Sequence, residues 1–384
     1  MSYHIPYGKQ EITEADINAV VEVLKSEFLT QGPSIAAFEE AFAKYIGSEY
    51  AVAVANGTAA LHLCTLALAV EPGQQVITTP ITFAASANCV LYAGGNIQFA
   101  DIDSTTYLID LNQVEDILKK DSQKTIKGII PVDFTGLPVN MEEVRTLADK
   151  YNCWIIEDAC HAPGAGFTDT KGVKQKSGNG QFADLAIFSF HPVKHIAAGE
   201  GGMITTNDKK LYEKLLLLRT HGITKSPEQM MDNHGGWYYE MVKLGYNYRI
   251  TDIQAALGHS QLKRADENLN KRYQIGEKYF DAFKHLPLQL PIMLEDSYHA
   301  FHLFVVQVAE RKRLYDFLRE KGIFTQVHYI PLHLMPYYQQ FGWKKGDLPK
   351  AENFYEHCLS LPMYPSLQED EQQYVIDSIN QFFK

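Results

Sequence analysis

Short apolar runs rich in β-branched residues recur through the first half of the chain and constrain its fold most strongly. Helical patterns such as TAALHLCTLALA (58–69) and MEEVRTLADKY (141–151) lie between them. This alternation predicts βαβ units around a buried, mostly parallel sheet. The runs are AVAVAN (51–56), QVITTP (75–80), IQFADI (97–102), TIKGIIPVDF (125–134), CWIIEDA (153–159), LAIFSF (185–190) and GMITTN (202–207).

The length of the chain predicts two unequal lobes. Its 384 residues exceed the roughly 250 to 300 residues at which a single hydrophobic core stops growing. Near residue 250 the pattern changes to long helices, and the strand-like run HAFHLFVVQV (299–308) follows. We therefore expect an N-terminal segment and large α/β domain over residues 1–255, and a smaller α+β domain over residues 256–384.

The composition excludes some classes of partner. The formal net charge of −11 argues against a nucleic-acid surface, which needs a clustered basic face. A phosphorylated small molecule is still compatible, because a single pocket can be locally positive.

No metal site or membrane segment is expected. The five cysteines lack metal-site spacing, so reduced buried thiols are the simplest interpretation. The first 16 residues hold no apolar core of signal-peptide length, and no later stretch of about 18 residues is uninterruptedly apolar. A cytoplasmic protein without membrane contact is the expectation.

Polar residues follow several of the predicted strands, where open α/β sheets bind their ligands. After AVAVA, Gly57, Thr58 and Ala59 open an apolar helix, whose free backbone N–H groups and positive dipole suit a phosphate. Simple helix capping is the alternative. The stretch is neither a P-loop nor a GxGxxG turn, so it gives no support for a nucleoside triphosphate or NAD.

Two further strand ends carry ionisable groups. Asp158 ends the strand CWIIED, with His161 three residues on, and a buried carboxylate there needs a partner. That partner is either a structural cation or the nitrogen of a cationic heterocycle. Ser189 and Lys194 follow LAIFSF, where the flanking SFH and GEGG indicate a tight turn in the sheet. Most lysines are solvated, but burial at a strand end lowers the pKa of a lysine and makes it a nucleophile.

Phe83 completes a set of four features. It follows the strand QVITTP, where an aromatic ring either covers a planar ligand or packs in the core. A phosphate cradle, a ring cover, a carboxylate and a lysine, in that order, are what a pyridoxal 5′-phosphate (PLP) enzyme needs. The combination predicts a PLP site.

The sequence resembles the sugar aminotransferases of the DegT/DnrJ/EryC1/StrS family over essentially its whole length. The resemblance implies a PLP-dependent transferase of fold type I, with a mostly parallel seven-stranded sheet in the large domain and a smaller α+β C-terminal domain. The matching stretches are LTQGP (29–33), NGTAALHL (56–63), TTPITFAASAN (78–88), PVDFTGLPVNM (131–141), IIEDACHAPGA (155–165), SFHPVK (189–194), GEGG (199–202), LGYNYRITDIQAALGHSQL (244–262) and VHYIPLH (327–333).

The resemblance also implies roles for individual residues. Lys194 would bind the cofactor aldehyde covalently and shuttle the proton, while Asp158 would pair with the pyridinium nitrogen. Phe83 would stack on the ring and His161 would lie near its hydroxyl. The phosphate would be held by Gly57, Thr58, Ala59 and Ser189, and by Asn247 of a neighbouring subunit, which makes the protein a homodimer with shared active sites.

Two positions separate this chain from relatives. Ala197 and Ala198 stand where relatives often carry threonine or serine, so altered hydrogen bonding is expected before GEGG. The dehydratase branch of the family carries histidine in place of the catalytic lysine, whereas this chain has Lys194. An aminotransferase is therefore the expected activity.

The implied reaction moves the amino group of L-glutamate to C4 of a UDP-linked 4-keto-6-deoxy N-acetyl hexose, in pseudaminic acid biosynthesis. Transfer to C4 or C3 of another UDP- or dTDP-keto-sugar is an alternative, and a non-catalytic PLP-binding regulator is another. Loops that border the acceptor pocket in the family contain Tyr7, Thr30, Gln31, His328 and Tyr329, while Lys25 and Arg249 are available for the diphosphate. For Arg249 a structural ion pair is the competing role.

Overall fold

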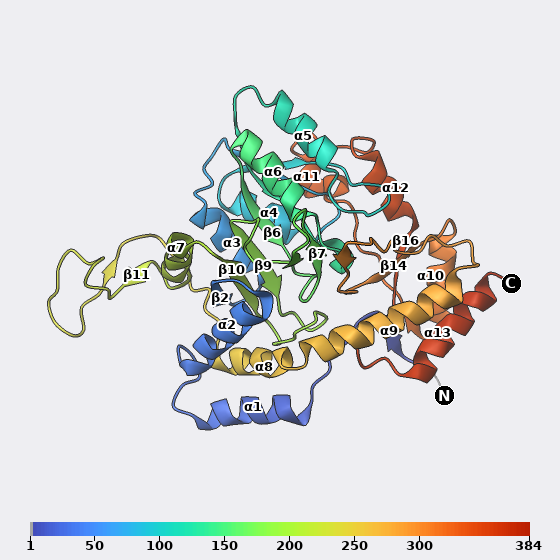
Figure 1. Ribbon diagram of the computed structural model, residues 1–384, viewed down its shortest axis with the longest axis horizontal. Helices are drawn as coiled ribbons and strands as arrows, with labels where there is room; N and C mark the ends of the chain where they lie inside the picture. Colours follow the sequence, from blue (N-terminus) through green and yellow to red (C-terminus); the bar gives the residue numbers. More distant parts are fainter. Residues whose placement is uncertain (1–2) are drawn as a thin grey trace.

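The computed structural model describes residues 3–384 and is built around one seven-stranded sheet (Figure 1). The strand order is β2-β10-β9-β6-β5-β3-β4, and only β10 runs antiparallel to its neighbours. The predicted fold is therefore confirmed, because each of the seven apolar runs supplies one strand. These are β2 (Tyr50–Val54), β3 (Gln75–Thr78), β4 (Asn96–Phe99), β5 (Ile126–Ile130), β6 (Trp154–Asp158), β9 (Leu185–Ser189) and β10 (Gly202–Thr206).

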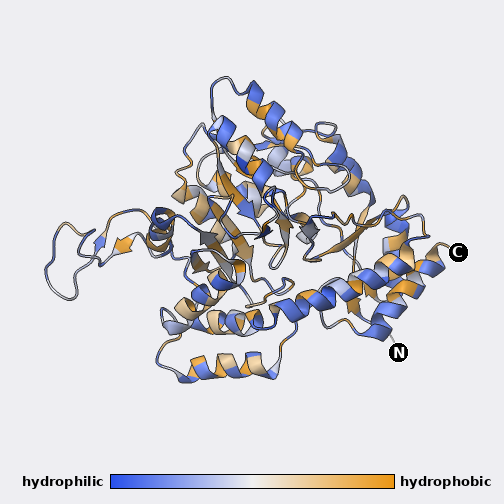
Figure 2. Ribbon diagram, viewed as in Figure 1, coloured by the Kyte–Doolittle hydropathy of each residue, from blue (hydrophilic) through white to orange (hydrophobic). Residues whose placement is uncertain are grey.

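Helices cover both faces of this sheet, and its strands are almost fully buried. Figure 2 shows the apolar residues concentrated in the central strands and on one side of the surrounding helices. Ala197 and Ala198 are buried too, and Ala198 packs in the core cluster on the α2 side of the sheet. The helices of this part are α1 (Glu14–Lys25), α2 (Pro33–Ile46), α3 (Gly57–Ala67), α4 (Ala85–Tyr92), α5 (Leu111–Lys120), α6 (Met141–Tyr151), α7 (Lys209–Arg219) and α8 (Asp252–Leu262).

The C-terminal part has its own hydrophobic core. The 19-residue helix α9 (Ala265–Phe283) runs from α8 toward α10 and α13 (Figure 1). Tyr279 and Phe283 pack there against strand β14. The predicted division at residue 255 stays a prediction. This part contains α10 (Arg311–Glu320), α11 (Pro336–Gln339), α12 (Pro349–His357), α13 (Glu369–Phe382), β14 (Phe304–Gln307), β15 (Ile323–Phe324) and β16 (Cys358–Leu361).

Short strands join segments that are distant in sequence. The N-terminal β1 (Ile5–Pro6) pairs in parallel with β15, so the first residues lie in the C-terminal part. A three-stranded sheet is formed by β7 (Gly166–Thr168), β8 (Lys174–Lys176) and β13 (Ser297–Tyr298). The hairpin of β11 (Ile223–Thr224) and β12 (Glu240–Met241) projects from the body beside α7 (Figure 1). Within residues 3–384, no helix has the length and apolar character needed to cross a membrane.

A buried ion pair joins α1 to the rest of the molecule. Asp16 is fully buried, and its Oδ2 lies 2.6 Å from Nη2 of Arg264. Gln261 of α8 donates to the same oxygen at 2.9 Å. Loss of this buried carboxylate would remove an acceptor from both Gln261 and Arg264, so Asp16 fixes α1 against α8.

Replacing Asp16 by alanine should therefore lower the free energy of unfolding by about 3 kcal/mol. Urea denaturation at pH 7 measures the change. Glu369→Ala is the matched control, since its ion pair with Lys278 is exposed and its loss should leave the midpoint unchanged. Equal midpoints for Asp16→Ala and the parent protein would show that the pair does not stabilise the fold.

Candidate active site

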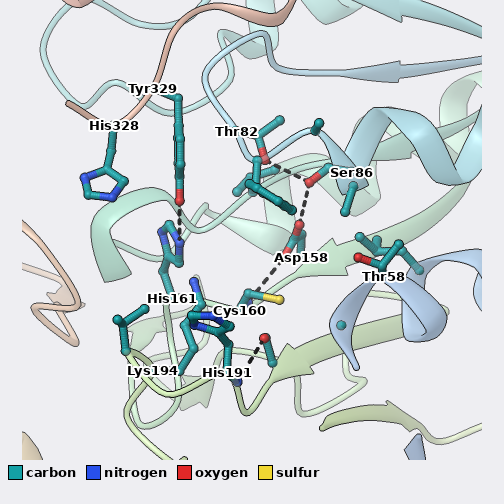
Figure 3. Close-up of a pocket in the computed structure, with 18 of the residues that line it drawn as sticks. Thr58, Thr82, Ser86, Asp158, Cys160, His161, His191, Lys194, His328 and Tyr329 are labelled. Atoms are coloured by element: carbon teal, nitrogen blue, oxygen red, sulfur yellow. Dashed lines mark hydrogen bonds between the residues drawn. The ribbon is translucent and has the colours of Figure 1, made fainter. Parts of the chain in front are cut away.

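A cavity of about 670 Å³ lies at the carboxyl ends of the parallel strands (Figure 3). Residues that follow β2, β3, β6 and β9 line one side of it, and the segment from residue 326 to 330 lines another. Strand order explains the convergence, because parallel strands end at the same edge of a sheet. Its polar lining includes Tyr7, Asn56, Thr58, Thr82, Ser86, Asp158, Cys160, His161, Ser189, His191, Lys194, Glu200, Gln326, His328 and Tyr329.

Asp158 is buried at the end of β6 and is held by two hydrogen bonds. Ser86 donates its hydroxyl to Oδ2 at 2.7 Å, and the backbone N–H of Cys160 donates to Oδ1 at 3.2 Å. Thr82 lies 2.8 Å from the Ser86 hydroxyl and completes the chain drawn in Figure 3. No lysine or arginine among residues 3–384 lies within ion-pair distance of this carboxylate. The structural salt bridge is therefore absent, and the carboxylate can take a cationic ligand atom.

Lys194 extends into the same cavity from the turn after β9. Its backbone N–H donates to the carbonyl of His191 at 2.8 Å, which confirms the tight turn expected from the sequence. Burial lowers the pKa of Lys194 below its ordinary value of 10.5, although the charge of Asp158 works in the opposite direction. The amine is therefore more easily deprotonated than that of a surface lysine, as a nucleophile requires.

The N-terminus of α3 supplies an anion site next to Ser189. Gly57 and Thr58 are the first two residues of the helix, and their backbone N–H groups have no hydrogen-bond partner in the described part of the chain. Both residues and Ser189 line the cavity. A Cβ at Gly57 would lie 3.1 Å from Cβ of Ser189, so the glycine keeps this corner open. Two N–H groups, a hydroxyl and the helix dipole suit a phosphate.

Ala59 does not join this set. Its N–H donates to Oδ1 of Asn56 at 2.8 Å, and the residue does not line the cavity. The capping role that was the alternative for this stretch thus applies to the third N–H of the helix. The first two remain available to a ligand.

Aromatic and imidazole rings form the other walls. Phe83 lines the cavity and is 63% exposed, so the alternative of core packing is wrong for this residue. The hydroxyl of Tyr329 lies 3.3 Å from Nε2 of His161, and these rings stand close to Lys194 in Figure 3. His328 is fixed by a 2.8 Å hydrogen bond between its Nδ1 and the Ser360 hydroxyl, and its ring lies 5.0 Å from that of Tyr7.

Besides Ala59, five predicted residues lie outside the cavity of their own chain. Lys25 is exposed and forms an ion pair with Glu22. Thr30 bridges to Thr251 and Asn247 bridges to Thr220, both as isolated backbone pairs. Gln31 and Arg249 are 3.5 Å apart and border a separate hollow. Arg249 has no acidic partner within ion-pair distance among residues 3–384, so the structural ion pair proposed as its alternative role is not formed.

Sequence reasoning missed three residues that shape the site. Ser86 donates a hydrogen bond to Asp158 from the first turn of α4. It follows Thr82 by four residues, and this spacing was a usable signal in the sequence. Cys160 orients the same carboxylate through its backbone N–H, which any residue would supply. His302 contacts Lys194 from a loop more than 100 residues away, and no local pattern marks it.

The residues present fit the cofactor that the resemblance implies. PLP carries a phosphate, a pyridinium nitrogen and an aldehyde, and the cavity offers the free N–H groups of Gly57 and Thr58, the uncompensated carboxylate of Asp158 and the amine of Lys194. All three groups lie in one cavity of suitable size for a small cofactor.

Substituting Gly57 by valine should weaken PLP binding at least about 10-fold, because the side chain closes the corner beside Ser189 and displaces the phosphate. Absorbance titration of the cofactor-free protein with PLP measures the affinity. Gly276→Ala in α9 is a suitable control, since its Cβ would meet only ordinary van der Waals contacts with Phe301. Unchanged affinity in Gly57→Val would remove this helix terminus from the phosphate site.

Comparison with known proteins agrees with this geometry. The UDP-4-amino-4,6-dideoxy-N-acetyl-β-L-altrosamine transaminase of Campylobacter jejuni subsp. jejuni serotype O:2 is 38% identical over 381 residues, which cover 98% of this chain and 96% of the relative.

Two solved structures superpose over nearly the whole chain. Helicobacter pylori PseC, an aminotransferase involved in the biosynthesis of pseudoaminic acid, matches with a TM-score of 0.89 at 32% identity and covers 99% of both chains. The PLP form of the sugar aminotransferase Spr1654 from Streptococcus pneumoniae matches with a TM-score of 0.89 at 28% identity, covering 99% of this chain and 98% of the other.

The model of the DegT/DnrJ/EryC1/StrS aminotransferase family matches residues 10–380. The expected family and cofactor are thereby confirmed. The chain belongs to this family and is a PLP-dependent sugar aminotransferase.

Proposed function

We propose that the protein transfers the amino group of L-glutamate to C4 of a UDP-linked 4-keto-6-deoxy N-acetyl hexose, in pseudaminic acid biosynthesis. The observation that carries the transfer chemistry is the convergence of Lys194, Asp158 and the free helix terminus of α3 on one cavity. The likeness to the C. jejuni transaminase and to PseC supports the substrate and the pathway.

Bound PLP supplies an electron sink for the pair of electrons left when a proton leaves the donor carbon. Asp158 holds the ring nitrogen protonated, because a buried carboxylate favours a cationic partner. Its two hydrogen bonds, from Ser86 and from the N–H of Cys160, fix the carboxylate and keep it from rotating. Asp158 thus acts through electrostatic preorganisation: its charge is already oriented before the reaction begins.

Lys194 is the proton carrier in this proposal. Its amine would take up the proton that leaves the α-carbon of glutamate and hold it for return, and it would play the same part with the sugar. The lowered pKa of Lys194 favours the neutral amine that the first step requires.

The remaining walls position the ligands. Gly57, Thr58 and Ser189 bind the phosphate, Phe83 covers one face of the ring, and His161 lies by the ring hydroxyl. Tyr7, His328 and Tyr329 line the acceptor side. In this proposal the sugar binds between the segment 326–330 and the carboxyl ends of the strands.

We also propose a homodimer with shared sites. Asn247 would complete the phosphate site of a neighbouring subunit, and Lys25, Thr30, Gln31 and Arg249 would lie near its acceptor. The support is their position, because all five lie outside the cavity of their own chain while Arg249 carries a charge without an acidic partner in the described residues.

Two alternative functions can be compared with this proposal by the residues that each would need. An aminotransferase for another UDP- or dTDP-keto-sugar would use the same Lys194 and Asp158 and would differ only in the acceptor walls. A PLP-binding regulator without catalysis has no need for a lysine of lowered pKa together with a carboxylate for the ring nitrogen. The presence of both groups favours an enzyme.

Changing Asp158 to asparagine should leave PLP bound and reduce amino transfer about 1,000-fold, because the amide cannot hold the ring nitrogen protonated. Rates of the glutamate half-reaction, followed by the loss of visible cofactor absorbance, test this expectation. Asp184→Asn removes a carboxylate that bonds only to Ile155 and Arg145 and should react normally. Near-normal turnover in Asp158→Asn would remove Asp158 from its assigned role.

The substrate is tested by offering glutamate together with a panel of 4-keto and 3-keto sugars linked to UDP or dTDP. We expect amination of the UDP-linked 4-keto-6-deoxy N-acetyl hexose with the highest kcat/KM, identified by mass spectrometry of the product. Exclusive use of a dTDP-linked or 3-keto sugar would contradict the proposed acceptor while leaving the family intact. Absence of transfer to every sugar would favour the regulator.

A further inference from the structure

His302 lies behind Lys194 and contacts its amine from outside the cavity lining. The distance between Nζ of Lys194 and Nε2 of His302 is 3.4 Å. His302 is 4% exposed, and its other ring nitrogen has no hydrogen-bond partner among residues 3–384. In the described part of the chain, the lysine amine is therefore the only hydrogen-bond partner of this imidazole.

The loop that carries His302 is held rigidly. Arg272 of α9 is buried and donates Nη1 to the carbonyls of Phe301, His302 and Met363 at 3.0, 3.3 and 2.9 Å. The backbone N–H of Ala300 donates to Gly136 at 2.7 Å, on the far side of the loop. These bonds fix the backbone from which the imidazole reaches Lys194.

The chemistry of the contact follows from the charges around the ring. Burial lowers the pKa of His302 well below 6.5, and the charges of Lys194, His161, His195 and Arg272 act in the same direction. The imidazole is thus neutral at physiological pH. A lysine ammonium has only N–H donors, so Nε2 of the neutral ring accepts and the ring proton resides on Nδ1.

We propose that His302 is a positioning residue for Lys194: it accepts a hydrogen bond from the ammonium and aims the side chain whenever the amine is not bonded to the cofactor. The role in transfer rests on the proposed function. In that cycle Lys194 would take up the proton that leaves the donor carbon and would hold it as an ammonium until it is returned. His302 neither gains nor loses a proton, but it stabilises the intermediate ammonium.

Two amides distinguish this role from simple packing. The amide of His302→Gln reaches the position of Nε2, whereas that of His302→Asn reaches only the position of Nδ1. His302→Leu removes both. Glutamine should therefore preserve the contact with Lys194, while asparagine and leucine should abolish it.

The first test uses the cofactor-free full-length protein. Competitive acetylation at a series of pH values, read on the Lys194 peptide by mass spectrometry, gives the pKa of Lys194. Loss of an acceptor for the ammonium should lower the pKa of Lys194 by about one pH unit in His302→Leu and in His302→Asn. In His302→Gln the pKa should equal that of the parent protein. His299→Gln is the control, because His299 is buried in the same loop but contacts Thr135 and Phe301.

Unchanged pKa values in both His302→Leu and His302→Asn would overturn the proposal. An equal decrease in His299→Gln would do the same, because it would assign the effect to the loop as a whole. If His302→Leu does not fold, the comparison of the two amides decides the outcome alone.

The second test is single-turnover reaction with L-glutamate and with α-deuterated L-glutamate. Misplacement of the amine should slow His302→Asn about 10- to 100-fold without changing glutamate affinity, and should raise the primary isotope effect as proton transfer becomes limiting. An unchanged isotope effect contradicts the positioning role. If the parent protein itself fails to react, the proposed donor is wrong, and the acetylation result still judges His302.

Discussion

The buried carboxylate of Asp158 is the constraint on which the rest of the site depends. It ends β6 in the interior, receives hydrogen bonds from Ser86 and from the Cys160 N–H, and has no lysine or arginine within ion-pair distance among the described residues. A buried carboxylate without a cationic partner costs free energy, and a bound ligand can supply that partner. In the proposed function PLP would do so through its ring nitrogen, and the same ligand would require a phosphate site and an amine at fixed distances from that nitrogen.

The sheet meets these requirements through its strand order. The residues of the site are far apart in sequence, yet each lies at or after the carboxyl end of a strand, and these ends share one edge of the sheet. They are residues 57 and 58, 82 to 86, 158, and 189 to 194. The C-terminal part closes the cavity with His328 and Tyr329, and Arg272 fixes the loop that brings His302 to Lys194. Asp158 is therefore oriented by neighbours in its own part of the molecule, whereas Lys194 contacts a histidine from the C-terminal part.

Much of this arrangement was predictable from the sequence, for identifiable reasons. Strands that are buried on both faces are apolar throughout, so all seven were visible, and residues at their ends were natural candidates. Ala59 was predicted as a phosphate ligand, but Asn56 takes its N–H, a competition that side-chain geometry decides. His302 was not predictable, because its contact depends on a loop held by two hydrogen bonds from a distant arginine. Arg249 and Asn247 lie outside the cavity of their own chain, and the sequence alone places no residue relative to a second subunit.

The central claim is that Lys194 is the residue to which PLP binds covalently in this cavity. Borohydride reduction of the PLP-loaded protein makes that bond permanent, and peptide mass spectrometry then locates it. The account predicts one cofactor per chain, attached to the peptide that contains Lys194, and loss of the label when L-glutamate is added before reduction. Attachment to another lysine, or no attachment to a protein that has bound PLP, would contradict it.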